Sequence, residues 1–333
     1  MEHIAIDLGG RESQVCVRSA DGAVVEERRI ATKSVPEFLA KRAPGRVIVE
    51  TCTESFAVAD AAKTAGHEVR VVPAMLVRSL GVGARRTKTD RRDAQALSQA
   101  SCRIDLPSVH VPSHESRERK NICSMRDGLV RARTALINSA RAWLRREARS
   151  VRASPETLPQ RIRAAMSIPP EVDQVLVSIE QLTVQIRAAD KHVAQLAKSD
   201  ELCRRLMTVP GIGPITALRF KATLDEHDRF ASAHAVQSYL GIVPGEHSSS
   251  ERRQRLSITK AGPVALRWSL VQAAWSARRY AADDPMVRWC FEVEKRRGKR
   301  IAVVALARKL AGILFAIWRD GSVYDSTRGA AMS

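Results

Sequence analysis

Aromatic residues and paired cysteines are scarce in this chain. Phe, Trp and Tyr make up only 4% of the 333 residues, so base stacking is not expected to dominate any binding to nucleic acid. The six cysteines are scattered, and no two stand at the spacing of a zinc knuckle or a redox pair; they are Cys16, Cys52, Cys102, Cys123, Cys203 and Cys290. We therefore expect reduced, mostly buried thiols.

Long apolar runs are also lacking. A membrane helix needs about 20 uninterrupted apolar residues, and the nearest approach, residues 303–318, carries Arg308 and Lys309 in its middle. The first residues reach Glu2 at once and lack the basic start and apolar core of a signal peptide. We expect a cytoplasmic protein with no membrane partner.

Acidic residues are too few to balance the basic ones. The chain has 55 Lys and Arg against 36 Asp and Glu, which gives a formal charge of +19 and a pI near 10.4. Such self-repulsion is tolerated mainly where a polyanion neutralises it, so nucleic acid is the expected partner. The alternative is a generally basic proteome or a ribosome-associated protein.

Residues 1–112 alternate short apolar runs with helical patterns, as α/β layer folds do. The expected strands are residues 4–8, 14–18, 24–30, 47–50 and 69–72, and the expected helices are residues 35–41 and 56–65. Asp21-Gly22 is a strong hairpin signal between the second and third strands. This order of elements is that of ribonuclease-H-like domains, and we predict such a catalytic domain here.

Residues 113–200 carry little strand signal and a regular helical one. Apolar residues alternate steps of three and four, the pattern of a coiled-coil seam: Val172, Val175, Ile179, Leu182, Ile186, Ala189, Val193 and Leu196. An antiparallel hairpin within the chain and a coil between chains both fit, and the regularity favours an oligomer. Residues 201–327 form a mostly helical, basic third unit, and residues 328–333 a frayed tail.

Four carboxylates in the first third stand where functional acids are expected. Asp7 and Glu50 each end an apolar run, and Asp90 and Asp93 open a helical stretch on one face. Oxygen ligands suit Mg²⁺ or Mn²⁺, and two such ions support phosphodiester displacement. The alternative is that each acid caps a helix or lies on the surface.

The run Ala5-Ile6-Asp7-Leu8-Gly9-Gly10 has a second interpretation. It is similar to the phosphate-binding turn of actin-like sugar kinases, which share the ribonuclease-H-like fold. The charge of +19 and the lack of a second glycine-rich phosphate turn argue against a sugar kinase.

The last third holds three candidate nucleic-acid contacts. Gly211 and Gly213, in a Pro-Gly-Ile-Gly turn, are typical of a helix-hairpin-helix, whose backbone N–H groups contact phosphate; a tight helix–helix turn is the alternative. Ser248, Ser249 and Ser250 follow a Gly/Pro turn, which alone would indicate a solvated loop. Cations follow them, as serine attack on a phosphodiester would need; they are Arg252, Arg253, Arg255 and Lys260. A later basic run, Lys295, Arg296 and Arg297, continues through Lys299 and Arg300 and fits either phosphate contacts or a solvated surface.

These motifs together resemble one family. Asp7, Glu50 and the run from Thr87 to Ala94 resemble the DEDD catalytic domain of bacterial insertion-sequence recombinases related to the Piv pilin invertase. Residues 209–213 and 239–244, Ser249, residues 259–262 and residues 309–311 resemble the transposase domain of that family. The similarity covers nearly the whole chain, although Gly10 stands where relatives often carry lysine.

The resemblance implies a DNA transposase that cuts and rejoins donor and target DNA. It implies a Holliday-junction-resolvase-like domain that binds Mg²⁺ through the four acids, and attack by Ser249 to give a covalent intermediate. It also implies a noncoding bridge RNA and a composite site shared between subunits of a dimer or tetramer. The alternatives are a two-metal junction nuclease that uses water, and a noncatalytic basic protein that bridges DNA.

Overall fold

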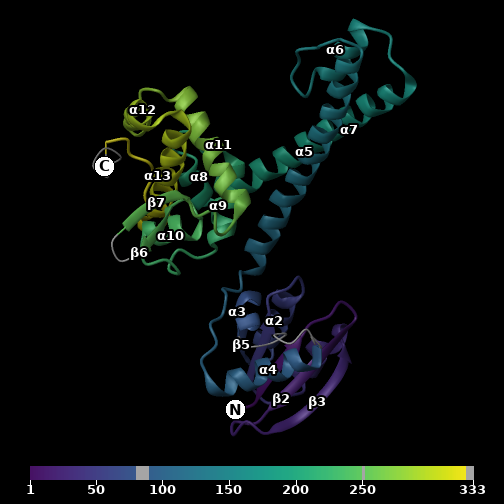
Figure 1. Cartoon of the computed structure of the whole chain (residues 1–333), viewed down its shortest axis with the longest axis vertical. Coiled ribbons are helices and arrows are strands. Elements are labelled where there is room, and N and C mark those ends of the chain that lie inside the picture. Colours follow the sequence, from purple (N-terminus) through teal and green to yellow (C-terminus); the bar gives the residue numbers. More distant parts are fainter. Residues whose placement is uncertain (80–89, 250–251, 328–333) are drawn as a thin grey trace. The chain divides into compact units, whose positions relative to one another are not determined.

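The computed structural model describes residues 1–79, 90–249 and 252–327, and for residues 77–79, 90, 246–249 and 252–256 it describes the backbone only. The chain divides into two units, Met1–Pro112 and Ser113–Ser333 (Figure 1).

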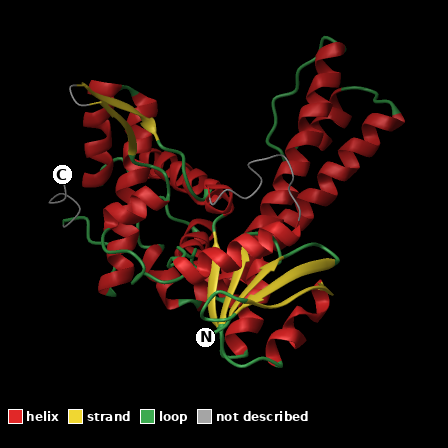
Figure 2. Cartoon of the chain, turned by 60° about the horizontal axis from the view of Figure 1, so that its bottom comes forward, coloured by secondary structure: helices red, strands yellow, loops and turns green. Residues whose placement is uncertain are grey.

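A five-stranded sheet organises the first unit (Figure 2). Its strands are β1 (His3–Asp7), β2 (Glu12–Arg18), β3 (Val24–Ala31), β4 (Arg46–Glu50) and β5 (Glu68–Val72). They lie in the order β3-β2-β1-β4-β5. The pairs β1–β2 and β2–β3 are antiparallel, and the pairs β1–β4 and β4–β5 are parallel. The predicted strands and their order along the chain are confirmed.

Helices cover both faces of this sheet because its central strands are apolar on both sides. Ile4 and Ile6 of β1 pack in one cluster with α1 (Val35–Ala40) and α2 (Ser55–Thr64). Ala5, between them, points to the other face and packs with Leu97 of α4 (Asp90–Arg103). The short η1 (Thr32–Ser34) and α3 (Ala74–Ser79) were not predicted.

Two long antiparallel helices open the second unit. They are α5 (His114–Arg146) and α7 (Pro170–Ser199), and the short α6 (Leu158–Ala165) packs near their far end (Figure 1). Arg126 of α5 donates to Asp190 of α7 at 2.7 Å, and Arg133 donates to Thr183 at 3.3 Å, so the two helices run in opposite directions. Of the two predicted arrangements, this structure contains the hairpin within one chain.

The buried stripe of α7 is shifted from the predicted seam. Ile179, Ile186 and Val193 are buried as expected. However, Leu176 and Thr183 are also buried, whereas the predicted repeat contained their neighbours Val175 and Leu182. The helix is therefore turned slightly, because it packs on α5 and also on α9 rather than on one partner helix.

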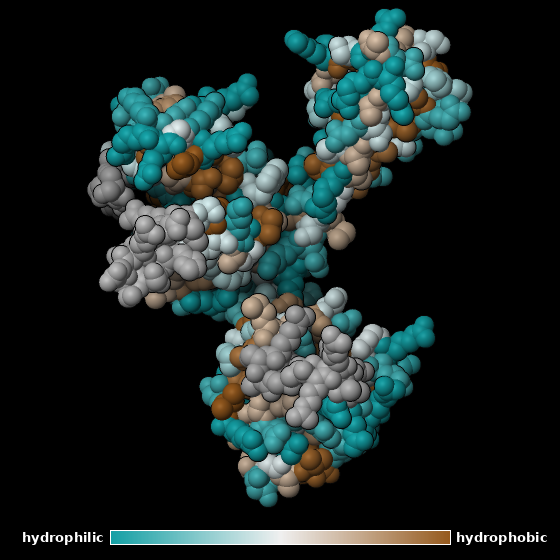
Figure 3. Space-filling model, viewed as in Figure 1, coloured by the Kyte–Doolittle hydropathy of each residue, from teal (hydrophilic) through white to brown (hydrophobic). Residues whose placement is uncertain are grey.

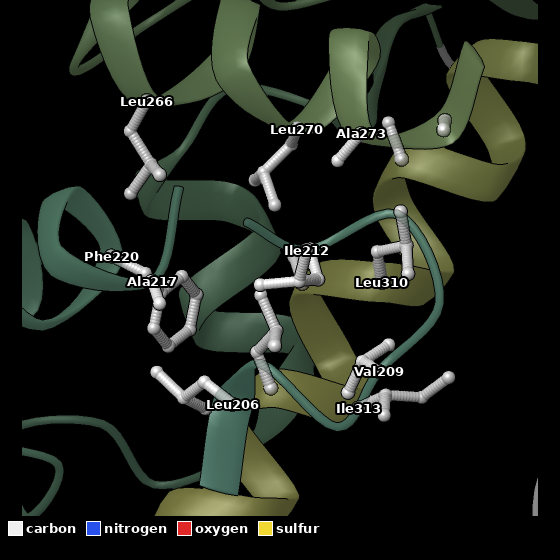
Figure 4. Packing of buried hydrophobic residues seen from close by; sticks show 14 of the residues in the cluster. Leu206, Val209, Ile212, Ala217, Phe220, Leu266, Leu270, Ala273, Leu310 and Ile313 are labelled. Atoms are coloured by element: carbon white, nitrogen blue, oxygen red, sulfur yellow. The ribbon is translucent and has the colours of Figure 1, made fainter. Parts of the chain in front are cut away.

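A helical body completes the second unit. Its helices are α8 (Glu201–Leu206), α9 (Pro214–Leu224), α10 (Ala233–Tyr239), α11 (Val264–Tyr280), α12 (Pro285–Arg297) and α13 (Lys299–Asp320). Figure 4 shows Leu266, Leu270 and Ala273 of α11 facing Leu206 and Phe220 across a shared core. One strand pair, β6 (Pro244–Ser249) and β7 (Arg252–Ile258), was not predicted in this mostly helical unit.

Helix α13 is long and apolar enough to cross a membrane by length and composition. However, 61% of its most apolar stretch is buried inside the protein. Leu310 and Ile313 point into the core in Figure 4. Its apolar character is therefore explained by its place at the centre of the helical body.

Asp200 joins the long hairpin to the helical body. Its Oδ1 atom accepts a hydrogen bond from the backbone N–H of Cys203 at 2.9 Å and so caps α8. Its Oδ2 atom accepts from Arg119 of α5 at 2.9 Å and from Lys221 of α9. Burial alone would raise the pKa of Asp200, but the hydrogen bonds, above all that from Lys221, lower it to about 2.

We predict that Asp200→Asn lowers the free energy of unfolding of the second unit by about 2–3 kcal/mol at pH 7. Because the folded-state pKa lies below the unfolded one, this stabilisation is complete above about pH 4 and is lost as the pH falls toward 2. Urea titrations followed by Trp fluorescence report this unit, since all five Trp lie in it. The control is Glu201→Gln, whose side chain is 75% exposed. An equal loss in the control would contradict the prediction.

Candidate functional site

Asp7 and Glu50 lie at the same edge of the sheet. The parallel register pairs Ile6 of β1 with Val49 of β4, and one further step places Asp7 beside Glu50. Side chains alternate along a strand, and Ala5 and Ile48 point to the face that α4 covers. Asp7 and Glu50 therefore point to this same face, at the carboxyl ends of the two strands.

Helix α4 brings Asp93 to this edge. His3 Nδ1 and Ser101 Oγ are 2.8 Å apart, so the carboxyl end of α4 lies over the start of β1. From Ser101 back to Asp93 the helix spans about 12 Å, and from His3 to Asp7 the strand spans about 13 Å. Asp93 is only 1% exposed, which agrees with a side chain facing the sheet at the level of Asp7.

The fourth predicted acid, Asp90, is the first residue of α4, and its side chain lies outside the described residues, as do Thr87, Lys88 and Thr89 entirely. Among the side chains that are described, no group of three His, Cys, Asp or Glu is arranged to hold a metal ion. The donors at this edge are carboxylate oxygens, which suit Mg²⁺ because it keeps several waters and completes its shell with substrate phosphates.

The turn after Asp7 is held by backbone contacts. A Cβ at Gly9 would collide with the Glu12 carbonyl oxygen, so this position requires glycine. Thr32 Oγ1 donates to the Gly9 carbonyl at 2.6 Å and ties the turn to the end of β3. The tight β1–β2 turn thus explains why glycine is needed at position 9. No phosphate-binding role of the kind found in sugar kinases is required to explain it.

The β6–β7 hairpin carries the predicted serine. We call the two backbone segments at its base, which contain Gly241 and Gly262, the neck of the hairpin. Gly241 and Gly262 have φ of +66° and +74°, and a Cβ on either would collide with backbone atoms of the segment on the other side of the neck. Buried Arg267 of α11 donates through Nη1 to the carbonyls of Leu240 at 2.9 Å and Ala261 at 2.8 Å. Both sides of the neck are therefore fixed to α11 by one guanidinium.

Ser249 and Arg252 form the last backbone pair of the β6–β7 ladder. The side chains of Ser248, Ser249, Arg252, Arg253 and Arg255 lie outside the described residues, and Ser250 lies outside them altogether. Lys260, exposed just after the hairpin, adopts a φ of +56°, and its backbone N–H donates to the Gly241 carbonyl at 3.0 Å.

The turn from Val209 to Gly213 lies against the core. Val209 and Ile212 are buried beside α13 and α11, as Figure 4 shows. Gly211 has a φ of +84°, and a Cβ there would lie 2.9 Å from that of Ala277 and would collide with the Ala273 carbonyl. Packing against α11 thus explains Gly211, whereas a Cβ at Gly213 would meet open space.

The predicted basic run closes α12. Lys295 pairs with Glu292 at 2.8 Å, and Arg296 donates to the Glu292 carbonyl at 3.4 Å. Arg297 is exposed before Gly298, which turns the chain into α13. The face over α12 is strongly hydrophilic in Figure 3.

The first unit thus brings Asp7, Glu50 and Asp93 to one sheet edge, and the second carries the serine hairpin and the cations. Sequence reasoning missed Arg267, although its place in the apolar run Leu266-Arg267-Trp268 is a signal of a buried, hydrogen-bonded arginine.

Comparison with known proteins finds one match that covers the first unit and helix α5 of the second, and another match within the helical body. Residues 4–147 match the DEDD domain of IS110 transposases, and residues 203–286 match the transposase domain of the IS116/IS110/IS902 family. The chain is 28% identical to the transposase for insertion sequence element IS1111A of Coxiella burnetii, over 96% of this chain and 90% of that protein. It is 26% identical to the transposase for insertion sequence element IS1328 of Yersinia enterocolitica, over 97% and 98% of the two chains. It is also 26% identical to the pilin gene-inverting protein of Moraxella bovis, over 78% and 75%. The chain carries the domains of the IS116/IS110/IS902 family of insertion-sequence transposases and is a member of that family.

Proposed function

We propose that this transposase cuts and rejoins DNA with a ribonuclease-H-like metal site and a serine nucleophile. The observation that carries the proposal is the placement of Asp7 and Glu50 at adjacent parallel strand ends, with buried Asp93 on the same face. These carboxylates supply the oxygen donors that a divalent cation such as Mg²⁺ prefers.

The four acids would hold Mg²⁺ or Mn²⁺, which when bound activates the nucleophile and stabilises charge on the phosphate. The Ser249 hydroxyl attacks phosphorus, a serine–phosphate ester forms, and the deoxyribose oxygen leaves with a proton. Attack by another strand's hydroxyl on that ester reverses these steps and rejoins DNA. Arg252, Arg253, Arg255 and Lys260 follow Ser249 in sequence and would bind the phosphate.

The remaining cations would bind nucleic acid more broadly. Gly213 offers open backbone at the start of α9, Gly211 holds that turn on α11, and Lys295, Arg296 and Arg297 supply charge at the end of α12. The net charge of +19 supports a bridge RNA in addition to donor and target DNA. A dimer or tetramer would let the acids of one subunit meet the serine of another.

A two-metal nuclease that uses water is the second candidate, because the acid edge by itself suits such a reaction. It predicts cleavage without a covalent adduct. A noncatalytic DNA-bridging protein is the third, and it predicts that loss of the acids changes nothing.

We predict that Ser249→Ala reduces the amount of covalent protein–DNA adduct by about 10³-fold or more, because the attacking oxygen is removed. A denaturing gel of protein incubated with end-labelled element DNA and Mg²⁺ measures the adduct. Ser248→Ala and Ser250→Ala are the matched controls and should retain it. An adduct that persists in Ser249→Ala but is lost in a control would move the role to that serine.

We predict that Asp7→Asn and Glu50→Asn each lower Mn²⁺ binding at least about tenfold and abolish cleavage. Asp105→Asn is the control, since its side chain is 75% exposed on the same unit. Titration calorimetry with Mn²⁺ reports binding without any need for activity. Unchanged Mn²⁺ binding together with unchanged DNA cleavage would remove these acids from the site.

We predict that Arg267→Ala loosens the serine hairpin more than it unfolds the protein, because the carbonyls of buried Leu240 and of Ala261 lose their shared donor. Limited trypsin digestion should cut first within residues 244–258, and adduct formation should slow by about 10–100-fold while DNA affinity changes little. Arg267→Lys should recover part of the rate, because lysine can donate to one of the carbonyls. A digestion pattern identical to that of the natural protein would disprove the neck's role.

A further inference from the structure

A pocket of about 380 Å³ lies in the helical body, apart from the serine hairpin. Residues of α10, α12 and α13 line it, among them Gln237, Trp289, Arg308, Lys309 and Ile313. Its volume falls within the range of about 300–1,000 Å³ typical of small-ligand sites. The lining joins an apolar wall and an aromatic ring to two cations.

Neither cation of the pocket forms an ion pair with a described carboxylate. Within the described part of the chain, no carboxylate lies within 4.0 Å of the Arg308 guanidinium or the Lys309 ammonium. Lys309 Nζ lies 4.7 Å from the centroid of the Trp289 ring, and burial lowers the pKa of Lys309. Asp284 is the acid that acts on Lys309 electrostatically, but it already accepts hydrogen bonds from Met286 and Tyr324.

Arg308 is held in a fixed orientation. Its Nε atom donates to Gln237 Oε1 at 2.9 Å, and Gln237 Nε2 donates back to the Arg308 carbonyl at 3.1 Å. These bonds use Nε and leave the two Nη groups without a hydrogen-bond acceptor among the described residues. A preorganised guanidinium of this kind suits a phosphate, which accepts two parallel N–H donors.

Gly312 keeps the pocket open. It lies within α13, where glycine destabilises a helix by about 1 kcal/mol relative to alanine, and its backbone does not require a positive φ. A Cβ there would lie 3.1 Å from Gln237 Nε2 and 3.7 Å from the Ala233 Cβ. The absence of a side chain at this position therefore leaves room for the pocket, and a larger side chain would fill the pocket or displace Gln237.

The pocket lies near the predicted basic run on the same helix. Arg296 follows Trp289 by seven residues, which places it on the same side of α12 about 10 Å away. A nucleic-acid strand that binds the run would therefore pass close to the pocket.

We propose that this pocket binds one unpaired nucleotide of the nucleic-acid partner, with the phosphate on Arg308 and Lys309 and the base or sugar on Trp289 and the apolar wall. An acidic peptide would match the cations but would leave the aromatic and apolar wall without a counterpart. The proposal rests on the family's action on nucleic acid and is independent of Ser249 and of the metal site.

The test compares the binding of two DNA probes by the full chain in EDTA, where no cleavage interferes. One probe is a perfect duplex, and the other carries a single unpaired 2-aminopurine. The natural protein should bind the second about tenfold more tightly, as expected for one stacked base. Lys309→Gln and Gly312→Leu should reduce this ratio to about one and leave duplex affinity within about twofold.

Lys299→Gln is the matched control, since it removes a cation from the same helix outside the pocket and should weaken both probes equally. Thermal unfolding checks that Gly312→Leu is folded, and Lys309→Gln carries the test if it is not. A ratio of one in the natural protein, or an unchanged ratio in Lys309→Gln, would overturn the proposal. So would variants that keep the ratio but lose binding of an oligoglutamate peptide, which would indicate a protein-docking site.

Discussion

The parallel pairing of β1 with β4 is the interaction on which the candidate metal site depends. A slip of one residue between these strands would turn Glu50 to the opposite face and separate it from Asp7. The apolar residues fix this register, because Ile4 and Ile6 are buried under α1 and α2 while Ala5 is buried on the side of α4. The small Ala5 side chain also lets α4 approach closely. Core packing thus determines where the acids meet.

Much of this first unit follows from sequence because its signals are local. Strands with apolar residues on both faces, an Asp-Gly turn and acids at strand ends suffice to place Asp7 and Glu50 at the rim. The depth of Asp93 does not follow in the same way, since it depends on how α4 crosses β1 and on the contact of Ser101 with His3. Contacts between residues distant in sequence leave no periodic pattern.

The second unit was harder to predict for a different reason. The β6–β7 hairpin is rich in serine and arginine and lacks apolar alternation, so only its Gly and Pro residues signal a turn. The stripe of α7 departs from an ideal seam because α9 competes with α5 for its surface. Gly211 fits the pattern of a nucleic-acid turn, yet its contact with α11 gives it a packing role that sequence cannot reveal.

An isolated two-stranded hairpin is at best marginally stable in water. A nucleophile at the end of such a hairpin would be poorly positioned unless the base of the hairpin were rigid. Arg267 holds the base rigid by donating hydrogen bonds to two carbonyls, one on each side. Gly241 and Gly262 let the two backbone segments approach closely enough to share this one guanidinium. The Gly-Ile-Val-Pro and Lys-Ala-Gly segments, which lie within or beside the stretches that resemble the transposase domain, are therefore the two sides of this neck in three dimensions. These segments orient the hairpin through their glycines and through the carbonyls that Arg267 binds.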